Sequence, residues 1–407
     1  MLARLQKRFW QEPHLNQRNR EKDSAMTRRE YLESIMPTRE MVDHFVTPAK
    51  ADVPAELARI MCNNAQSAFD PEIGWVLCDG FRGGGVDDSR GFYAYEKDGA
   101  RQVVNCADRP CRIHTYGNSF THCDQVSNGE TWQEYLAAHL LEPVRNYGIG
   151  GHSVYQAYRR MLIVEREYPA EYVILNVWDD DHFRNLDAWR SIRMGRQGRF
   201  TLPHLRVNLE SGTVEERENL CKTPEELYRL CDADWVWETF GDDPILHAVM
   251  ARKGSVEDAS AMAQSMGGEL ENAGSDAEVY SLHTEAALFA TRFVIEKAEA
   301  FTKAKGKKLL VILSFGSHNV ANALKGEPLF DQTFLDWLAT KDVPMIDLRD
   351  AFREEYATYR GDVQTFLAPY YIGHHTPRGN FFFAWAIKDR IVEWLDPKPL
   401  PYQIASD

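Results

Sequence analysis

Continuous apolar runs recur along the chain after residue 111. The run YVILNVW at 172–178 is rich in β-branched residues and lacks regular alternation, which is typical of a strand buried on both faces. The runs at 308–315 and 343–348 repeat this texture. Two shorter segments, CRIHTYG at 111–117 and PVRNYGIGG at 143–151, are further candidate strands. We therefore predict five strands.

Amphipathic segments lie between these runs. Thr131 to Glu134 has the spacing of a capping box that opens a helix, and 153–165 places its apolar residues on one face. The segments 285–303 and 377–395 show the same helical stripe. Alternation of strand and helix predicts a parallel sheet with helices on both faces. We expect an α/β fold, a three-layer α/β/α sandwich around a five-stranded parallel sheet, within residues 111–396.

Two regions depart from this alternation. Residues 1–110 begin as a polar, charged arm with helical patterns at 27–36 and 38–46, and continue at 69–111 with short aromatic runs between Gly and Asp turns, typical of hairpins. The interval 182–284 is too long for a simple connection, so it is predicted to be a lid-like insertion with structure of its own. Residues 397–407 form a C-terminal tail.

Composition narrows the class of protein. The 407 residues are 44% hydrophobic, enough for a sizeable core. Sixty-one acidic against 47 basic residues give a net charge of −14, which argues against nucleic acid or an anionic membrane as a partner. Neither a secretory signal nor a membrane span is evident in the first 24 residues, so we expect a cytoplasmic protein. Seven cysteines without a Cys-x-x-Cys pair indicate reduced thiols rather than a disulfide framework or zinc site.

Polar residues follow the predicted strands. They are Asn118 and Ser119, the glycines of 148–151, the cluster Asp179 to His182, Ser317 with His318, and His374 with His375. In open parallel sheets, ligands bind beyond the carboxyl ends of the strands. A serine, a histidine and backbone N–H groups at such a place are the components of a serine hydrolase.

These motifs resemble, in order and spacing, those of the SGNH (GDSL-like) hydrolase superfamily. YGNSFT is similar to its first block and maps the nucleophile to Ser119, while NYGIGG is similar to its second block and maps an oxyanion N–H to Gly151. YIGHHTPRGN is similar to the fifth block, in which a histidine stands five residues before a glycine. Counting back from Gly379 selects His374 rather than His375. The resemblance spans about 112–395, with 182–284 unmatched.

Two positions depart from the family pattern. Tyr371 stands where the family usually has the aspartate that orients the histidine, although some members use a backbone carbonyl instead. Asp179 stands where an asparagine should donate to the oxyanion. An ionised Asp179 would repel that charge, so we expect it to be protonated, turned away, or re-used as the carboxylate lost at Tyr371.

The resemblance implies a serine esterase that hydrolyses a short-chain acyl ester, above all an acetyl ester, of a small molecule or carbohydrate. Ser119, His374, Gly151 and Asp179 are its expected catalytic residues, and Asn118, Asp180 and His375 its expected substrate-binding residues. No cofactor or metal is expected. The sequence does not indicate an oligomeric state.

Three alternatives stay open. The same site could transfer the acyl group to an alcohol, or the fold could bind a ligand without catalysis, since Tyr371 and Asp179 replace expected groups. Asp179 to His182, with His122, Asp124 and His374, could hold a metal ion. This last alternative is disfavoured, because neighbouring residues in an extended segment point to opposite sides. Cys123 is expected to be a buried thiol rather than a nucleophile.

Overall fold

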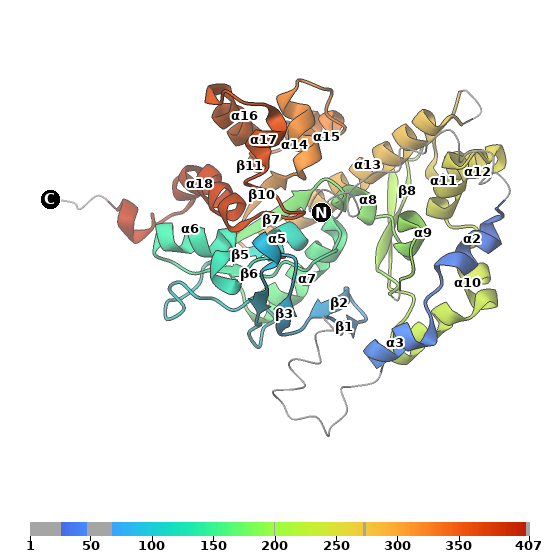
Figure 1. Ribbon diagram of the computed structural model, residues 1–407, viewed down its shortest axis with the longest axis horizontal. Coiled ribbons are helices and arrows are strands. Elements are labelled where there is room, and N and C mark those ends of the chain that lie inside the picture. Colours follow the sequence, from blue (N-terminus) through green and yellow to red (C-terminus); the bar gives the residue numbers. More distant parts are fainter. Residues whose placement is uncertain (1–25, 47–66, 199, 272–273, 404–407) are drawn as a thin grey trace. The chain divides into compact units, whose positions relative to one another are not determined.

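The computed structural model describes residues 26–46, 67–198, 200–271 and 274–403. Its contacts divide the chain into two units (Figure 1). The larger unit comprises 47–185 and 291–407, and the smaller comprises 1–46 and 186–290. Helix α13 (Asp276–Ala304) contributes residues to both.

A five-stranded, all-parallel sheet forms the centre of the larger unit. Its strand order is β11-β10-β7-β5-β6. All five predicted strands are present: β5 (Ile113–Tyr116), β6 (Val144–Asn146), β7 (Tyr172–Trp178), β10 (Lys308–Ser314) and β11 (Met345–Asp347). The register places Thr115 of β5 beside Ile174 of β7 and Asn146 of β6.

Helices cover both faces of the sheet, which explains why β7 is buried along its whole length. On one face, Ile174 and Ile312 belong to a core shared with α6 and α18, in which the rings of Trp132 and Phe383 stack 4.6 Å apart. Helix α7 contacts β5 and β7, and Figure 1 shows it on the other side of the sheet from α6 and α18. The predicted three-layer α/β/α sandwich is therefore confirmed.

The remaining elements of the larger unit surround this sandwich. Its helices are α5 (Ser119–His122), α6 (Trp132–Leu140), α7 (Val154–Glu167), α8 (Asp181–Arg184), α14 (Ser317–Leu324), α15 (Gln332–Leu338), α16 (Leu348–Thr358), α17 (Val363–Leu367) and α18 (Pro377–Trp394), with 3-10 turns at Val86–Asp88, Asn128–Glu130 and Leu400–Tyr402. The hairpins predicted within 69–111 are present as β1 (Ser67–Asp70) with β2 (Gly74–Leu77) and β3 (Gly80–Arg82) with β4 (Gly91–Tyr93).

The predicted capping box of α6 is only half formed. The Thr131 hydroxyl accepts the N–H of Glu134, as expected. The Glu134 carboxylate does not return to Thr131; it accepts the N–H groups of Val104 and Asn105 at 3.0 and 2.7 Å. The segment before β5 thus binds the Glu134 carboxylate in place of the backbone N–H of Thr131. The helix still begins at the predicted place, because one cap bond suffices.

The smaller unit consists of the N-terminal helices and most of the insertion. Its elements are α2 (Arg28–Ile35), α3 (Arg39–Val46), α9 (Ser191–Met194), β8 (His204–Asn208), β9 (Thr213–Arg217), the 3-10 helix η5 (Pro224–Cys231), α10 (Ala233–Phe240), α11 (Pro244–Arg252) and α12 (Val256–Met266). Tyr31 of α2 donates its hydroxyl to the carbonyl of Ile192 at 2.6 Å, which joins the N-terminal helices to the insertion.

The contacts do not follow the expected boundary at residue 110. Of the described residues before that boundary, 26–46 belong to the smaller unit and 67–110 to the larger. Arg101 shows why: its backbone N–H donates to Asn146 at 2.8 Å and its guanidinium to the carbonyl of His122 at 2.6 Å. The hairpin region is thereby bound to the sheet edge and to the turn after β5.

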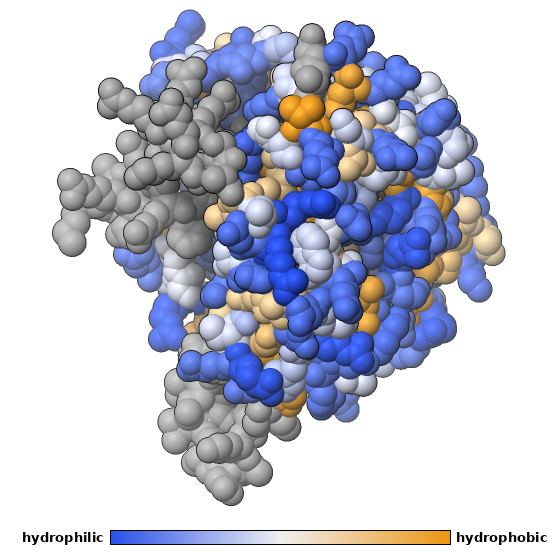
Figure 2. All heavy atoms as spheres, turned by 90° about the vertical axis from the view of Figure 1, so that its right-hand side faces the viewer, coloured by the Kyte–Doolittle hydropathy of each residue, from blue (hydrophilic) through white to orange (hydrophobic). Residues whose placement is uncertain are grey.

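The surface is in keeping with the net charge. Figure 2 shows a face of the molecule on which hydrophilic residues predominate and hydrophobic residues are scattered in small groups. Among the described helices, none combines the length and apolar character needed to cross a bilayer.

Candidate functional site

The turn after β5 explains the sequence Gly117-Asn118-Ser119. A Cβ atom on Gly117 would lie 2.1 Å from the Thr121 hydroxyl oxygen and 2.6 Å from the carbonyl oxygen of Asn176, so no larger residue fits. Asn118 is the N-cap of α5, and its side-chain oxygen accepts the N–H of Phe120 at 2.8 Å. Ser119 is consequently fixed as the first residue of α5, at the carboxyl end of the strand.

Asn118 positions this turn from within. Its side chain is fully buried, and its amide nitrogen donates to Asp181 at 2.8 Å. Both ends of the amide are thus engaged inside the protein. Asn118 therefore positions the turn, and its expected contact with the substrate stays a prediction.

Asp181, which the sequence analysis considered only within the cluster Asp179 to His182, contacts this turn. Its carboxylate also accepts the backbone N–H of Trp178 at 3.1 Å and the guanidinium of Arg184 at 2.9 Å. Burial raises the pKa of Asp181 to about 7 despite these partners. Only the fold brings this carboxylate to Asn118, since the two residues follow β7 and β5, which are neighbours in the sheet but not in the sequence.

His374 is held by an amide. The side-chain oxygen of Gln125 accepts the backbone N–H of His374 at 3.0 Å and lies 2.9 Å from its Nδ1. The Gln125 amide nitrogen donates to the carbonyls of Gly84 and Ile372 at 2.6 and 3.4 Å, which fixes which end of the amide faces the imidazole. An amide oxygen only accepts, so Nδ1 carries the hydrogen and the Nε2 lone pair of the neutral ring is available as a base.

Gln125 was not among the site residues expected from the sequence. It directly follows Asp124, six residues after Ser119. Its backbone adopts φ +75°, which no local sequence pattern indicates. Tyr371, at the position of the expected aspartate, has a different use. Its hydroxyl donates to the carbonyl of Phe315 at 3.1 Å.

Asp124 supplies a carboxylate near His374. Its Oδ1 lies 2.6 Å from Nδ1 of His122, whose Nε2 lies 2.6 Å from the Tyr95 hydroxyl. Burial opposes ionisation of Asp124, but the interactions with His122 and His374 outweigh it and hold the pKa of Asp124 below its usual range. Burial lowers the pKa of His122 to about 4, so that imidazole is neutral at neutral pH.

The pKa of His374 reflects three effects. Burial lowers it most, the charge of Asp124 raises it by a smaller amount, and the charge of Arg184 lowers it further. The ring is therefore neutral near pH 7, as a general base requires.

The His374 ring lies close to the serine turn. Its centroid lies 5.1 Å from the ring of Phe120, the residue directly after Ser119. No hydrogen bond joins the Ser119 hydroxyl to His374 in the described part of the chain; such bonds are often long in free enzymes.

The glycine turn after β6 packs on the serine turn. A Cβ atom on Gly148 would lie 2.3 Å from the backbone nitrogen of His122, and the N–H of Ile149 donates to Gly117 at 3.0 Å. A Cβ atom on Gly150 would lie 3.0 Å from a carboxylate oxygen of Asp124. Gly151 ends this turn with φ +82°. The first and second sequence blocks are thus side by side.

Asp179 faces the beginning of α14. The N–H of Gly316 lies 3.2 Å from each carboxylate oxygen, and the Asn319 amide donates to one of them. Burial raises the pKa of Asp179 to about 7. The idea that Asp179 replaces the missing carboxylate is corrected, because Gln125 already occupies Nδ1 of His374.

Asp180 and His375 differ in accessibility. Asp180 is partly exposed and pairs with Arg184 at 2.7 Å. His375 is only 3% exposed, its ring lies 4.9 Å from that of Tyr371, and burial lowers its pKa to about 3. His375 therefore lies in the core, and the expected substrate contacts of His375 and Asp180 both stay predictions.

The cluster at 179–182 is not an extended segment, as the sequence reasoning assumed; Asp181 and His182 already belong to α8. Nδ1 of His182 lies 2.8 Å from the Thr291 hydroxyl, away from the neighbouring carboxylates. Among the described residues, no group of three or more His, Cys, Asp or Glu side chains could hold a metal ion. Cys123 is a buried thiol, and burial raises its pKa to about 12.

The site thus combines a serine at a strand end, a neutral histidine of fixed tautomer and a glycine turn. Comparison of the sequence with known protein-family models and with curated proteins found no match. The functional interpretation therefore depends on the geometry of these residues and on the order of the motifs.

Proposed function

We propose that this protein is a serine esterase of SGNH type. The observation that carries the proposal is the bond between Nδ1 of His374 and Oε1 of Gln125, because it fixes the tautomer that leaves Nε2 free to act as a base. The position of Ser119, at the end of a central parallel strand, adds the nucleophile.

The proposed reaction has two steps. Nε2 of His374 removes the hydroxyl proton of Ser119, whose oxygen attacks the ester carbonyl, and the N–H groups of Ser119 and Gly151 bind the oxyanion. His374 returns the proton to the leaving alcohol. Water, activated by the same imidazole, then releases the acid from the acyl-enzyme.

In this proposal, two residues share the role that a single carboxylate has in a Ser-His-Asp triad. Gln125 orients the imidazole, while the charge of Asp124 stabilises the imidazolium that forms during proton transfer. Neither residue touches the substrate in this mechanism. Both are positioning residues, and their loss should act on the proton-transfer step.

The substrate class follows from the space at the nucleophile. Ser119 is only 6% exposed, which favours a small acyl group such as acetyl on a small alcohol or carbohydrate. Long acyl chains would require the surrounding residues to move. A steep fall in kcat/KM with acyl chain length is the expected result.

Hydrolysis of 4-nitrophenyl esters tests the proposal. Turnover of the acetate should fall by about 10³-fold or more in Ser119→Ala, while Ser260→Ala, on the exposed face of α12, should match the wild type. Added methanol should partition the acyl-enzyme if transfer to alcohols competes with water. A folded protein that binds these esters without turnover or acylation of Ser119 would instead be a binding protein.

A further inference from the structure

Gln125, which orients His374 in the proposed site, is itself held by a segment outside the sequence motifs. Its backbone lies in the left-handed region, at φ +75°, which is uncommon for a residue with a long side chain. Such a conformation persists only where the surrounding structure holds it. The β3–β4 hairpin supplies that structure.

Three polar groups of Gln125 pack against this hairpin. Its backbone N–H donates to the hydroxyl of Tyr93, the last residue of β4, at 2.6 Å. Its side-chain nitrogen donates to the carbonyl of Gly84 at 2.6 Å. A Cβ atom on Gly85 would lie 2.9 Å from the Gln125 carbonyl oxygen, so a glycine is required for this close approach. The side-chain oxygen of Gln125 remains to accept from His374.

Tyr93 and Arg101 together fix the segment 122–125. Tyr93 is 1% exposed, and the guanidinium of Arg101 lies 4.4 Å from the centroid of its ring. Arg101 also donates to the carbonyls of His122 and Cys123, at 2.6 and 2.9 Å. Burial raises the pKa of Tyr93, so its hydroxyl stays neutral at neutral pH.

We propose that the β3–β4 hairpin is a positioning element of the esterase site, and that Tyr93 acts through Gln125 on the tautomer of His374. Without the Tyr93 hydroxyl, the N–H of Gln125 loses its acceptor, and the backbone leaves the left-handed region more readily. The amide oxygen then moves away from Nδ1, and the imidazole carries its hydrogen on Nε2 part of the time. In that tautomer the ring cannot accept the proton of Ser119. Tyr93 does not touch the substrate in this mechanism.

The effect on turnover rests on the proposed function, and kinetics with an acetate ester test it. Tyr93→Phe removes the hydroxyl but keeps the ring beside Arg101, and it should lower kcat about tenfold with little change in KM. In a Gln125→Ala background the same substitution should change kcat less than about twofold, because no amide is left to orient. Tyr168→Phe, at a position 46% exposed, should match the wild type. A loss in the Gln125→Ala background as large as in the wild type would overturn the proposed route through Gln125.

The glycines of the hairpin loop offer a second pair of variants. Gly85→Ala places a Cβ atom 2.9 Å from the Gln125 carbonyl oxygen and 2.6 Å from the side-chain oxygen of Ser89. The hairpin must then move, and kcat should fall by about tenfold or more. Gly83→Ala is the matched control, because its Cβ atom would meet no described atom within 4 Å. Equal activity of the two variants would show that the hairpin does not position Gln125.

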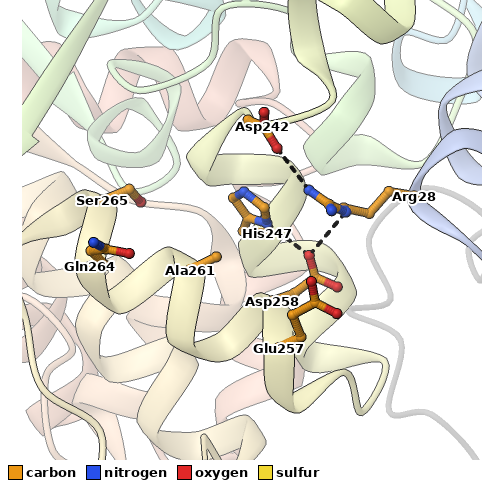
Figure 3. Close-up of a pocket in the computed structure, with 8 residues that line it drawn as sticks. All are labelled: Arg28, Asp242, His247, Glu257, Asp258, Ala261, Gln264 and Ser265. Atoms are coloured by element: carbon orange, nitrogen blue, oxygen red, sulfur yellow. Dashed lines mark hydrogen bonds and ion pairs between the residues drawn. The ribbon is translucent and has the colours of Figure 1, made fainter.

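The tautomer of His374 is measured without turnover by ¹⁵N NMR of protein labelled at histidine. Nδ1 should carry the hydrogen in the wild type, whereas both tautomers should be populated in Tyr93→Phe. His247 of the smaller unit, whose Nδ1 lies 2.7 Å from Asp258 (Figure 3), is the internal reference and should keep its signals. A wild-type protein without esterase activity would refute the proposed function, and this spectrum would then decide the inference. An unchanged tautomer of His374 in folded Tyr93→Phe would overturn it.

Discussion

Oε1 of Gln125 lies 2.9 Å from Nδ1 of His374 and accepts the backbone N–H of the same residue. In the proposed mechanism, a neutral amide performs the orienting part of the role that a carboxylate has in most serine hydrolase sites. Because the amide carries no charge, it does not raise the pKa of the imidazole. Burial then keeps His374 neutral and ready to accept a proton.

Gln125→Glu should convert this pair to a charged one. The carboxylate would favour the imidazolium, raise the pKa of His374 and move the acid limb of the kcat/KM profile to higher pH. Gln125→Ala should instead lower kcat by ~10–100-fold with little change in KM, because the ring loses its orientation. Profiles measured with an acetate ester check both, with Gln364→Glu on the exposed side of α17 as control. An unchanged profile in Gln125→Glu would contradict the pairing.

Asp124→Asn should have the opposite effect on pH dependence. The charge of Asp124 raises the pKa of His374, so its removal lowers that pKa further. Activity is lost as pH falls through the pKa of His374; the acid limb should therefore move to lower pH than in the wild type. Asp108→Asn, at an exposed position, serves as control. A shift to higher pH would show that Asp124 does not act on this imidazole.

Asp179 should reduce stability at neutral pH. Its pKa is about 7 in the folded state, above the ~3.9 expected for an unfolded chain. Between these values the folded state binds more protons, so stability falls as pH rises from ~4 to ~7. Asp179→Asn should raise the thermal midpoint by about 3 °C at pH 8 and by less at pH 5. Asp181 titrates in the same range and stays in both proteins, so only the difference between them is diagnostic.

Gly148 should tolerate no side chain. Gly148→Ala places a Cβ atom 2.3 Å from the backbone of His122, which should lower the free energy of unfolding by ~3 kcal/mol or more, as overpacking of a rigid turn does. Gly129→Ala is the matched control, because its Cβ atom would meet nothing closer than 3.9 Å. Urea denaturation of both variants measures the difference. Equal stability would mean that the two turns do not pack as described.

The hydrophobic pattern was sufficient to predict the sheet. Strands such as β7 are buried on both faces, and this burial leaves a continuous apolar run that needs no knowledge of tertiary structure. The order of Ser119, Gly151 and His374 was also readable, because each follows a strand or precedes a helix. Whether these three residues act together is still a prediction that the geometry supports.

The partners of these residues were not predictable. Gln125 reaches His374 across 249 positions of the chain, and Asp181 reaches Asn118 across 63. Neither pairing leaves a local signal. The burial of single side chains could not be predicted either. His374 and His375 are neighbours in sequence, yet only His375 is part of the core. The division at residue 46 was missed because helices α2 and α3 pack on a segment far along the chain.

The nucleophilicity of Ser119 is the central claim, and intact-protein mass spectrometry after exposure to a fluorophosphonate tests it most directly. We predict a single adduct that maps to Ser119, is absent in Ser119→Ala and forms far more slowly in His374→Ala. His375→Gln, if folded, should be labelled at nearly the wild-type rate. A folded wild-type protein that forms no adduct, or one labelled equally fast without His374, would contradict the account.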